Sequence, residues 1–124
     1  MNIKKISLEQ LRHAINLRDL SNPADGSHSM QILMDDIIYA LKSSWKCQVK
    51  IYRENPIVSI EANYDRLNYP KDGASRDARY TRYVCDTALL RTQGSAMVPN
   101  AMQEVSTNLP DDILLAMPGL TYRR

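Results

Sequence analysis

The spacing of the apolar residues changes abruptly once in this chain, and that change limits its fold most strongly. Between positions 27 and 45 the spacing is helical, with apolar side chains at Met30, Leu33, Met34, Ile37, Ile38, Leu41 and Trp45. From Cys47 to Ile51 every second residue is apolar, which is typical of a half-buried strand. The sequence therefore predicts a long amphipathic helix, from Ser27 or His28 to Trp45, that leads into a strand.

Weaker signals predict further elements on both sides of this unit. Ser7-Leu8-Glu9-Gln10 has the form of a capping box, which predicts a helix that ends within the turn-forming residues 21–26. Later elements are predicted in this order: a strand at 57–60, a long loop from 61 to 83, a strand at 88–90, a helix from about 95 to 105, a strand at 112–117, a turn at 118–119 and a last strand from 120. This mixture of elements predicts an α+β fold with an antiparallel sheet.

The length and charge of the chain fit a single domain, residues 1–124. One domain usually has about 100 to 200 residues, and this chain has 124. Its 16 Lys and Arg residues face 14 Asp and Glu residues, so bulk electrostatics alone would not hold a nucleic acid. The sequence shows neither a signal peptide nor an apolar run near the about 18 residues of a membrane span, so a cytoplasmic location without membrane contact is expected.

The sequence lacks the common motifs that carry chemistry by themselves. It contains no GxxxxGK[ST], GxGxxG, HExxH or GxSxG pattern. Cys47 and Cys85 lie in no CxxC pattern and are predicted to be reduced and structural. His13 and His28 lie far apart in the chain and are assigned to no metal. No bound metal is therefore predicted.

Several short motifs nevertheless follow one another in a specific order. The predicted long helix and its strand lead into Pro56-Ile57-Val58. The later motifs are Asn63-Tyr64-Asp65-Arg66-Leu67-Asn68, Tyr69-Pro70-Lys71-Asp72, Arg76-Asp77, Thr81-Arg82-Tyr83, Leu89-Leu90-Arg91-Thr92-Gln93-Gly94-Ser95 and Pro118-Gly119-Leu120-Thr121-Tyr122-Arg123-Arg124. In this order, residues 28–124 resemble the catalytic domain of class II aminoacyl-tRNA synthetases, and within that class the alpha chain of phenylalanyl-tRNA synthetase.

The resemblance implies how the chain is organised. It divides the chain into a helical lead-in at 1–26, the first class motif at 27–60, a loop at 61–87, and a sheet with the start of the second class motif at 88–124. The implied architecture is part of a class II synthetase-type antiparallel β-sheet flanked by helices. The sequence ends within the second motif and contains no third one, so the 124-residue chain alone is expected to be inactive in adenylation.

The resemblance also implies a function and a catalytic residue. Members of this family activate an amino acid with ATP and Mg²⁺ and transfer it to tRNA, and phenylalanine is the candidate amino acid that the resemblance implies. Arg123 falls on the arginine of the second motif, which neutralises charge on the α-phosphate during activation. Arginine suits this task because its planar fork binds phosphate and carboxylate groups through paired hydrogen bonds.

Substrate-binding residues are implied next to the strand at 88–90. The family takes some acceptors for the substrate's ammonium group from the segment that matches Thr92 to Ser95. Ser95 is the family's residue, whereas Gln93 and Gly94 replace a histidine and a threonine, which alters the recognition of the amino group. Tyr83 is expected to line the same pocket, although a tyrosine at the edge of the core is an equally good interpretation.

The first class motif forms a two-fold interface in this family. We therefore expect a homodimer through the helix from His28 to Trp45 and the strand that follows, with Val49 and Pro56 in the interface. A second type of subunit is a further candidate partner.

Two alternatives to the ligase remain open. The changes at Gln93 and Gly94 suit a paralogue that activates an amino acid for an acceptor other than tRNA. A non-catalytic dimerisation or RNA-binding module is the other alternative, because the loop from 61 to 83 interleaves arginine and lysine with tyrosine. Four acidic residues reduce the net charge of this loop to +1, so pairing within the loop, including an Arg76–Asp77 ion pair, is the favoured interpretation.

Overall fold

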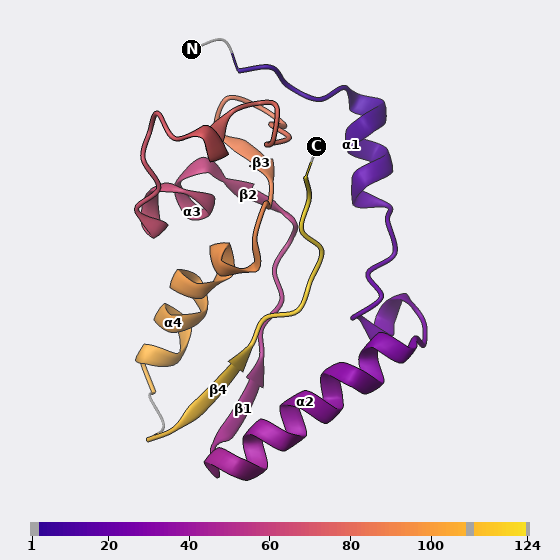
Figure 1. Cartoon of the computed structure of the whole chain (residues 1–124), viewed down its shortest axis with the longest axis vertical. Helices are drawn as coiled ribbons and strands as arrows, with labels where there is room; N and C mark the ends of the chain where they lie inside the picture. The colour runs from indigo at the N-terminus through magenta and orange to yellow at the C-terminus, as the bar shows by residue number, and fades with distance from the viewer. Residues whose placement is uncertain (1–2, 109–110, 124) are drawn as a thin grey trace.

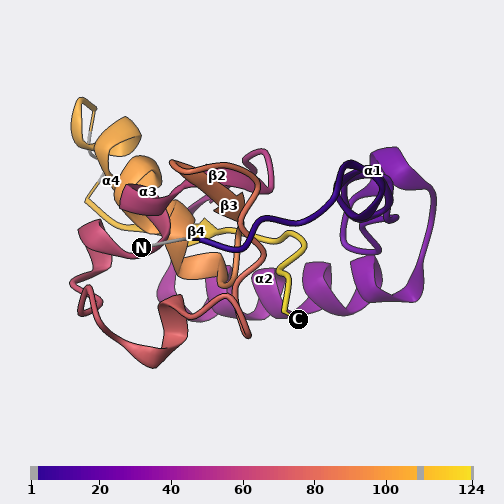
Figure 2. The ribbon, with the colours of Figure 1, turned by 90° about the horizontal axis from the view of Figure 1, so that it is seen from above.

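The computed structural model describes residues 3–108 and 111–123. Arg124, the last residue of the second-motif match, lies outside them. Helices α1 and α4 lie on opposite sides of the molecule, with the strands between them (Figures 1 and 2). The longer helices are α1 (Leu8–Ile15), α2 (Ser29–Trp45) and α4 (Val98–Ser106). None of the described helices is long and apolar enough to cross a membrane.

The two N-terminal helices begin at side-chain caps. At α1 the predicted capping box is confirmed, because the Gln10 N–H donates to the Ser7 hydroxyl and the Ser7 N–H donates to the Gln10 side chain. At α2 the Met30 N–H donates to Nδ1 of His28 over 3.0 Å. The predicted long helix is confirmed, and Lys46 ends it in the left-handed region, with φ at 53°. His28 thus caps a helix.

In the part of the chain that the structure describes, four strands form two separate pairs. They are β1 (Gln48–Ile51), β2 (Ile57–Ser59), β3 (Ala88–Leu90) and β4 (Ile113–Ala116). Strands β2 and β3 are antiparallel, as predicted, whereas β1 and β4 are parallel. The antiparallel prediction is therefore wrong for β1 and β4. A parallel pair needs a long crossover connection, and the residues between Ile51 and Ile113 supply one.

The predicted last strand from Leu120 does not form among the described residues. The segment after β4 runs beside β3, where the Tyr122 N–H donates to the Arg91 carbonyl over 2.8 Å. The Leu120 carbonyl instead accepts from the Arg91 side chain. Since a side chain occupies this acceptor, a regular ladder cannot continue there.

The predicted loop from 61 to 83 contains short helical turns. These are α3 (Ile60–Asn63) and the 3₁₀ turns η2 (Asp65–Leu67) and η3 (Ala74–Arg76). A third 3₁₀ turn, η1 (Pro23–Asp25), follows α1, and a fourth, η4 (Gly94–Met97), leads into α4, so the predicted helix at 95–105 is confirmed as the η4–α4 unit.

The predicted ion pair between Arg76 and Asp77 does not form, and each of the two residues has another partner. Arg76 pairs with Asp65 at 2.6 Å, and Asp77 pairs with Arg79 at 3.0 Å. Contact with Arg79 holds the pKa of the Asp77 carboxyl below its usual value, chiefly through the side-chain hydrogen bond. The loop is braced by internal pairing, as favoured, although not by the expected pair.

Seven of the buried apolar residues in the described part of the chain form two clusters that meet at β3. Leu89 packs with Val58, Tyr64 and Tyr83. The next residue, Leu90, packs with Ala14 and Tyr122. Successive strand residues point to opposite faces, so this short strand supports both clusters.

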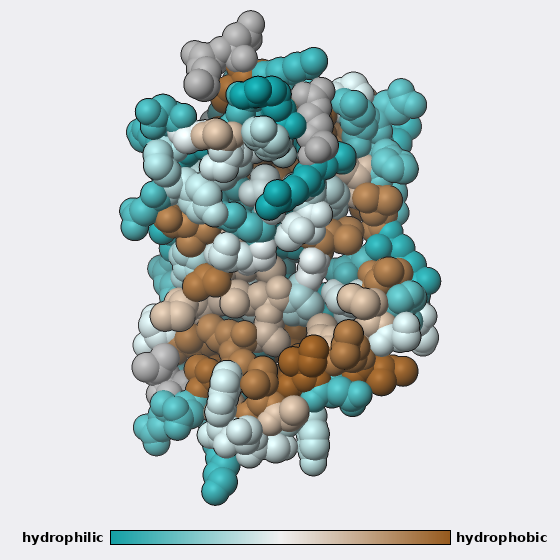
Figure 3. Space-filling model, in the orientation of Figure 1, coloured by the Kyte–Doolittle hydropathy of each residue, from teal (hydrophilic) through white to brown (hydrophobic). Residues whose placement is uncertain are grey.

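Helix α2, in contrast, buries none of its residues. Hydrophobic side chains gather over α2 and the β1–β4 pair (Figure 3). There Met30, Leu33, Met34, Ile37 and Ile38 form an apolar groove of about 300 Å³ with residues 116–118.

Tyr122→Phe tests the link between the C-terminal segment and α1. The Tyr122 hydroxyl donates to the Ala14 carbonyl over 3.1 Å in a buried position. Its removal should lower the free energy of unfolding by about 1 kcal/mol, measured by urea denaturation. Tyr39→Phe, at an exposed tyrosine, is the matched control and should leave stability unchanged. Equal stability of the two variants would contradict the assigned hydrogen bond.

Candidate functional site

One cavity gathers three of the residues that the sequence assigned to substrate. It has a volume of about 160 Å³ and is lined by Tyr64, Tyr69, Ser75, Tyr80, Thr92, Gln93 and Arg123. Thr92 and Gln93 follow the end of β3, and Arg123 follows Tyr122, whose backbone is bonded to Arg91. Two segments about 30 residues apart in the chain thus form opposite parts of one site.

Asn63 fixes the position of Thr92. This asparagine is fully buried at the end of α3. Its Nδ2 donates to the Thr92 hydroxyl over 2.9 Å, and its Oδ1 accepts from the Thr92 N–H over 3.1 Å. A buried amide that uses both of its ends holds its partner in one orientation.

Gln93 is held in a similar way from both ends of its amide. Its Nε2 donates to the Asn63 carbonyl over 3.0 Å, and its Oε1 accepts from the Tyr69 hydroxyl over 2.7 Å. An amide oxygen has two lone pairs, so one remains for a further donor such as an ammonium group. The side chain is therefore preorganised and has one acceptor position left for a ligand.

Tyrosine rings form the aromatic part of the site. The rings of Tyr64 and Tyr69 meet edge to face, with centroids 5.4 Å apart. The Arg76 guanidinium lies 4.9 Å from the centroid of the Tyr64 ring and donates to the carbonyls of Tyr69 and Pro70. Arg76 is thus bound to this loop and is not a free cation of the site.

Arg123 is the cation that this site presents to solvent. Its side chain is exposed, and it makes no hydrogen bond or ion pair with another residue in the described part of the chain. A guanidinium without a protein partner keeps all five N–H donors for a ligand. The cavity therefore combines an unpaired cation, an amide acceptor and aromatic walls, a combination that suits an anion next to an ammonium group.

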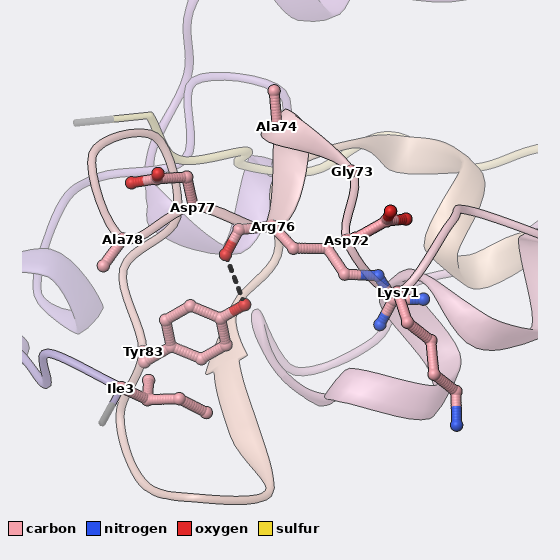
Figure 4. A pocket seen from close by; sticks show the side chains of 9 residues that line it. All are labelled: Ile3, Lys71, Asp72, Gly73, Ala74, Arg76, Asp77, Ala78 and Tyr83. Atoms are coloured by element: carbon pink, nitrogen blue, oxygen red, sulfur yellow. Dashed lines mark hydrogen bonds between the residues drawn. The ribbon is translucent and has the colours of Figure 1, made fainter. Parts of the chain in front are cut away.

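The other assigned residues lie elsewhere. Ser95 is exposed in η4 and is not part of the cavity lining. Tyr83 is buried and lines a second cavity, of about 250 Å³, with Ile3 and residues 71–78. Its hydroxyl donates to the Arg76 carbonyl over 2.7 Å (Figure 4), and burial is the main cause that raises its pKa. The structure thus does not bring Ser95 or Tyr83 together with Gln93 and Arg123.

The residues assigned to the dimer interface are both half-buried. Val49 lies in β1 opposite Leu114 of β4. Pro56 lies just before β2, and its carbonyl accepts from the Arg91 N–H over 2.8 Å. Both cysteines are free, as predicted. Over residues 3–108 and 111–123, no cluster of three or more His, Cys, Asp or Glu residues could hold a metal ion.

Two important residues of the site were not assigned from the sequence. Asn63 and Tyr69 belong to motifs that carry the resemblance, but neither was assigned a role in substrate binding. A buried asparagine within a polar loop looks like any turn residue until its partner is known. Only the position of Asn63 and Tyr69 within the ordered motifs could have indicated their role from the sequence.

Comparison with known proteins shows which class of protein this chain resembles. No protein-family model matches the chain. Phenylalanine–tRNA ligases are among the curated proteins that match it. The mitochondrial phenylalanine–tRNA ligase of Saccharomyces cerevisiae is 33% identical over 114 residues, which cover 89% of this chain and 24% of the yeast protein.

Within that class, the chain resembles the alpha subunit. The phenylalanine–tRNA ligase alpha subunit of Malacoplasma penetrans is 28% identical over 98% of this chain, and that of Geobacter sulfurreducens is 31% identical over 97%. The resemblance predicted from the sequence motifs is confirmed. The chain spans 36% and 33% of the length of these two relatives, so it corresponds to about a third of each.

Asn63→Asp tests how closely the site depends on the buried amide. A carboxylate keeps the acceptor for the Thr92 N–H but cannot donate to its hydroxyl, and burial disfavours the charged form. The pKa of the new carboxyl should be raised in the folded state, so stability is retained below the unfolded-state pKa of about 4 and lost as pH rises.

We expect Asn63→Asp to cost about 3 kcal/mol of unfolding free energy at pH 8 and clearly less at pH 4.5, each measured relative to the unmodified protein. Asn108→Asp is the control, because Asn108 is exposed. A loss that is the same at both pH values would exclude a buried carboxylate.

Proposed function

We propose that the protein activates an amino acid with ATP and transfers it to tRNA, with phenylalanine as the amino acid. The observation that carries this proposal is the meeting of Thr92, Gln93 and Arg123 on one cavity. The names of the relatives, phenylalanine–tRNA ligase, agree with it. A cytoplasmic location and a class II synthetase-type domain are part of the same proposal.

The chemistry of activation explains why an arginine is needed. A carboxylate oxygen attacks the α-phosphorus of ATP, a new P–O bond forms, and pyrophosphate leaves as its bond to that phosphorus breaks. Two anions must approach each other, and negative charge builds up on the oxygens of the α-phosphate. Arg123, exposed and unpaired, is proposed to bind that phosphate and the substrate carboxylate together. Mg²⁺ enters bound to ATP as part of the substrate.

The opposite part of the cavity suits the amino acid itself. The remaining lone pair of the Gln93 amide oxygen is proposed to accept from the substrate's ammonium group, with Thr92 beside it. Tyr64, Tyr69 and Tyr80 supply ring faces and edges, against which an aromatic side chain packs favourably. Ser95 and Tyr83 remain proposals as substrate residues and require the cavity to extend beyond its present lining.

Arg123→Ala tests the catalytic proposal. In the protein encoded by the complete reading frame that contains this sequence, it should raise the activation free energy of adenylate formation by about 2 to 4 kcal/mol. Arg123→Lys should rescue poorly, because a point charge cannot bridge two groups as a fork does. The assay is ATP–pyrophosphate exchange, with all standard amino acids offered separately.

Arg12→Ala is the control for this assay, since Arg12 is exposed on α1. Full activity in Arg123→Ala would remove Arg123 from the chemistry. Exchange without transfer to tRNA would favour the paralogue with another acceptor. Absence of exchange in the unmodified protein, with every amino acid, would favour the non-catalytic module.

We further propose a homodimer through α2 and β1, with Val49 and Pro56 at or next to the interface. Support comes from the exposed apolar side chains of α2, among them Leu33 and Ile37, each about half exposed. Apolar surface gathered on one helix in this way is typical of an interface. The word "alpha" in the relatives' names also suggests a second type of subunit as a partner.

Ile37→Glu tests the dimer. A carboxylate in the apolar groove should raise the dimer dissociation constant by at least about tenfold, since burial of an unpaired charge is costly. Sedimentation velocity over a micromolar concentration series measures it. Met102→Glu, at an exposed apolar residue of α4, is the matched control. A monomeric unmodified protein throughout the series would contradict the proposal.

A further inference from the structure

Arg91 is buried and forms no ion pair with any residue that the structure describes. It follows β3 and is 2% exposed, and it is the largest of the fully buried side chains in the described part of the chain. Its Nε and Nη2 both donate to the Leu120 carbonyl, over 3.1 and 2.8 Å. Its Nη1 has no hydrogen-bond partner among the described residues. Two of the three guanidinium nitrogens are therefore directed at a single backbone acceptor, and the third has no partner among the described residues.

A contribution to stability does not explain why a charged side chain is buried at this position. Burial lowers the pKa of Arg91, while the nearest carboxylates, those of Glu54 and Asp19, only partly offset that effect. Both acids have other partners: Glu54 accepts from Tyr52 and Asn100, and Asp19 lies 3.5 Å from Arg53. An apolar side chain of similar volume would fill such a space at lower cost.

The backbone of Arg91 is bonded on both sides as well. Its N–H donates to the Pro56 carbonyl, and its carbonyl accepts from the Tyr122 N–H, each over 2.8 Å. Together with the side-chain bonds to Leu120, this anchors the C-terminal segment at two residues, on either side of Thr121. Arg123 is the residue directly after the second anchor.

Gly119 permits the close approach of the guanidinium. A Cβ atom at this position would lie 2.5 Å from Nη2 and 3.5 Å from Cζ of Arg91. Any side chain there would displace the guanidinium from the Leu120 carbonyl. The pair of Gly119 and Arg91 is therefore a steric match, and either residue can be changed to disturb the same contact.

We propose that Arg91 is a positioning residue, which holds the C-terminal segment so that Arg123 faces Thr92 and Gln93 across the cavity. Thr92 and Gln93 directly follow Arg91 in the chain, whereas the position of Arg123 depends on the hydrogen bonds that join Arg91 to residues 120 and 122. Arg91 thus sets the separation of the two sides of the site. This inference rests on the proposed role of Arg123 in activation.

Arg91→Lys tests the inference, because an ammonium cannot form a two-pronged contact with the carbonyl. In the protein from the complete reading frame, kcat for ATP–pyrophosphate exchange should fall about ten- to a hundredfold, as expected for a misplaced catalytic group. The KM for the amino acid should change less than kcat, because Asn63 still holds Thr92 and Gln93 in place. Gly119→Ala should give the same pattern with Arg91 itself unchanged, and it serves if Arg91→Lys fails to fold.

A double variant separates positioning from a general loss of structure. If Arg91 acts through Arg123, adding Arg91→Lys to Arg123→Met should cause no further loss of kcat. Multiplicative losses would overturn the inference. Arg12→Lys, an exposed arginine of α1, is the matched control and should behave as the unmodified protein does.

Amide hydrogen exchange tests the anchor independently of activity. The Tyr122 amide should exchange at least about tenfold faster in Arg91→Lys, whereas the Leu89 amide in β3 should not change. Unchanged exchange at Tyr122 would overturn the inference even in an active enzyme. If the unmodified protein activates no amino acid, the proposed function fails, and faster exchange at Tyr122 would still support the anchoring by Arg91.

Discussion

The hydrogen bonds on the two sides of the Arg91 backbone hold together parts of the chain that are distant in sequence. The start of β2, the end of β3 and the C-terminal segment are joined at this one residue, through the Pro56 carbonyl and the Tyr122 N–H. The two apolar clusters adjoin the same place, because Leu89 and Leu90 directly precede Arg91. Thr92 and Gln93 of the candidate site directly follow Arg91, and Arg123 directly follows Tyr122. Backbone pairing at Arg91 is thus the constraint on which the relative position of Thr92, Gln93 and Arg123 depends.

Features that rest on nearby residues could be predicted from the sequence. The capping box at Ser7 and the helix from Ser29 to Trp45 need only side chains within a turn or two of each other, and both are confirmed. The direction of β1 relative to β4 could not be predicted in this way. It depends on the path of about sixty intervening residues, and alternation within a strand says nothing about the direction of its neighbour.

Predictions on polar residues show a similar limit. Arg76 and Asp77 are adjacent in sequence, but side chains of adjacent residues do not face each other in a turn of helix, and Arg76 instead reaches Asp65. The grouping of Gln93 with Arg123 came from the order of the motifs and not from any periodicity. Asn63 and Arg91 were missed because their importance comes from burial, and a polar residue shows its burial only through a partner far away in the chain.

Helix α2 stands apart from this tightly bonded centre. It buries none of its residues, and its contacts with the rest of the protein include half-buried apolar side chains and the hydrogen bonds from Gln31 to the carbonyls of Leu20 and Gly26. Local opening of α2 would therefore expose little additional apolar surface, and its free energy of opening should lie well below that of β3. A second protein bound to α2 would then do more than associate with it: part of the binding free energy would appear as resistance of this helix to proteolysis and to thermal fraying.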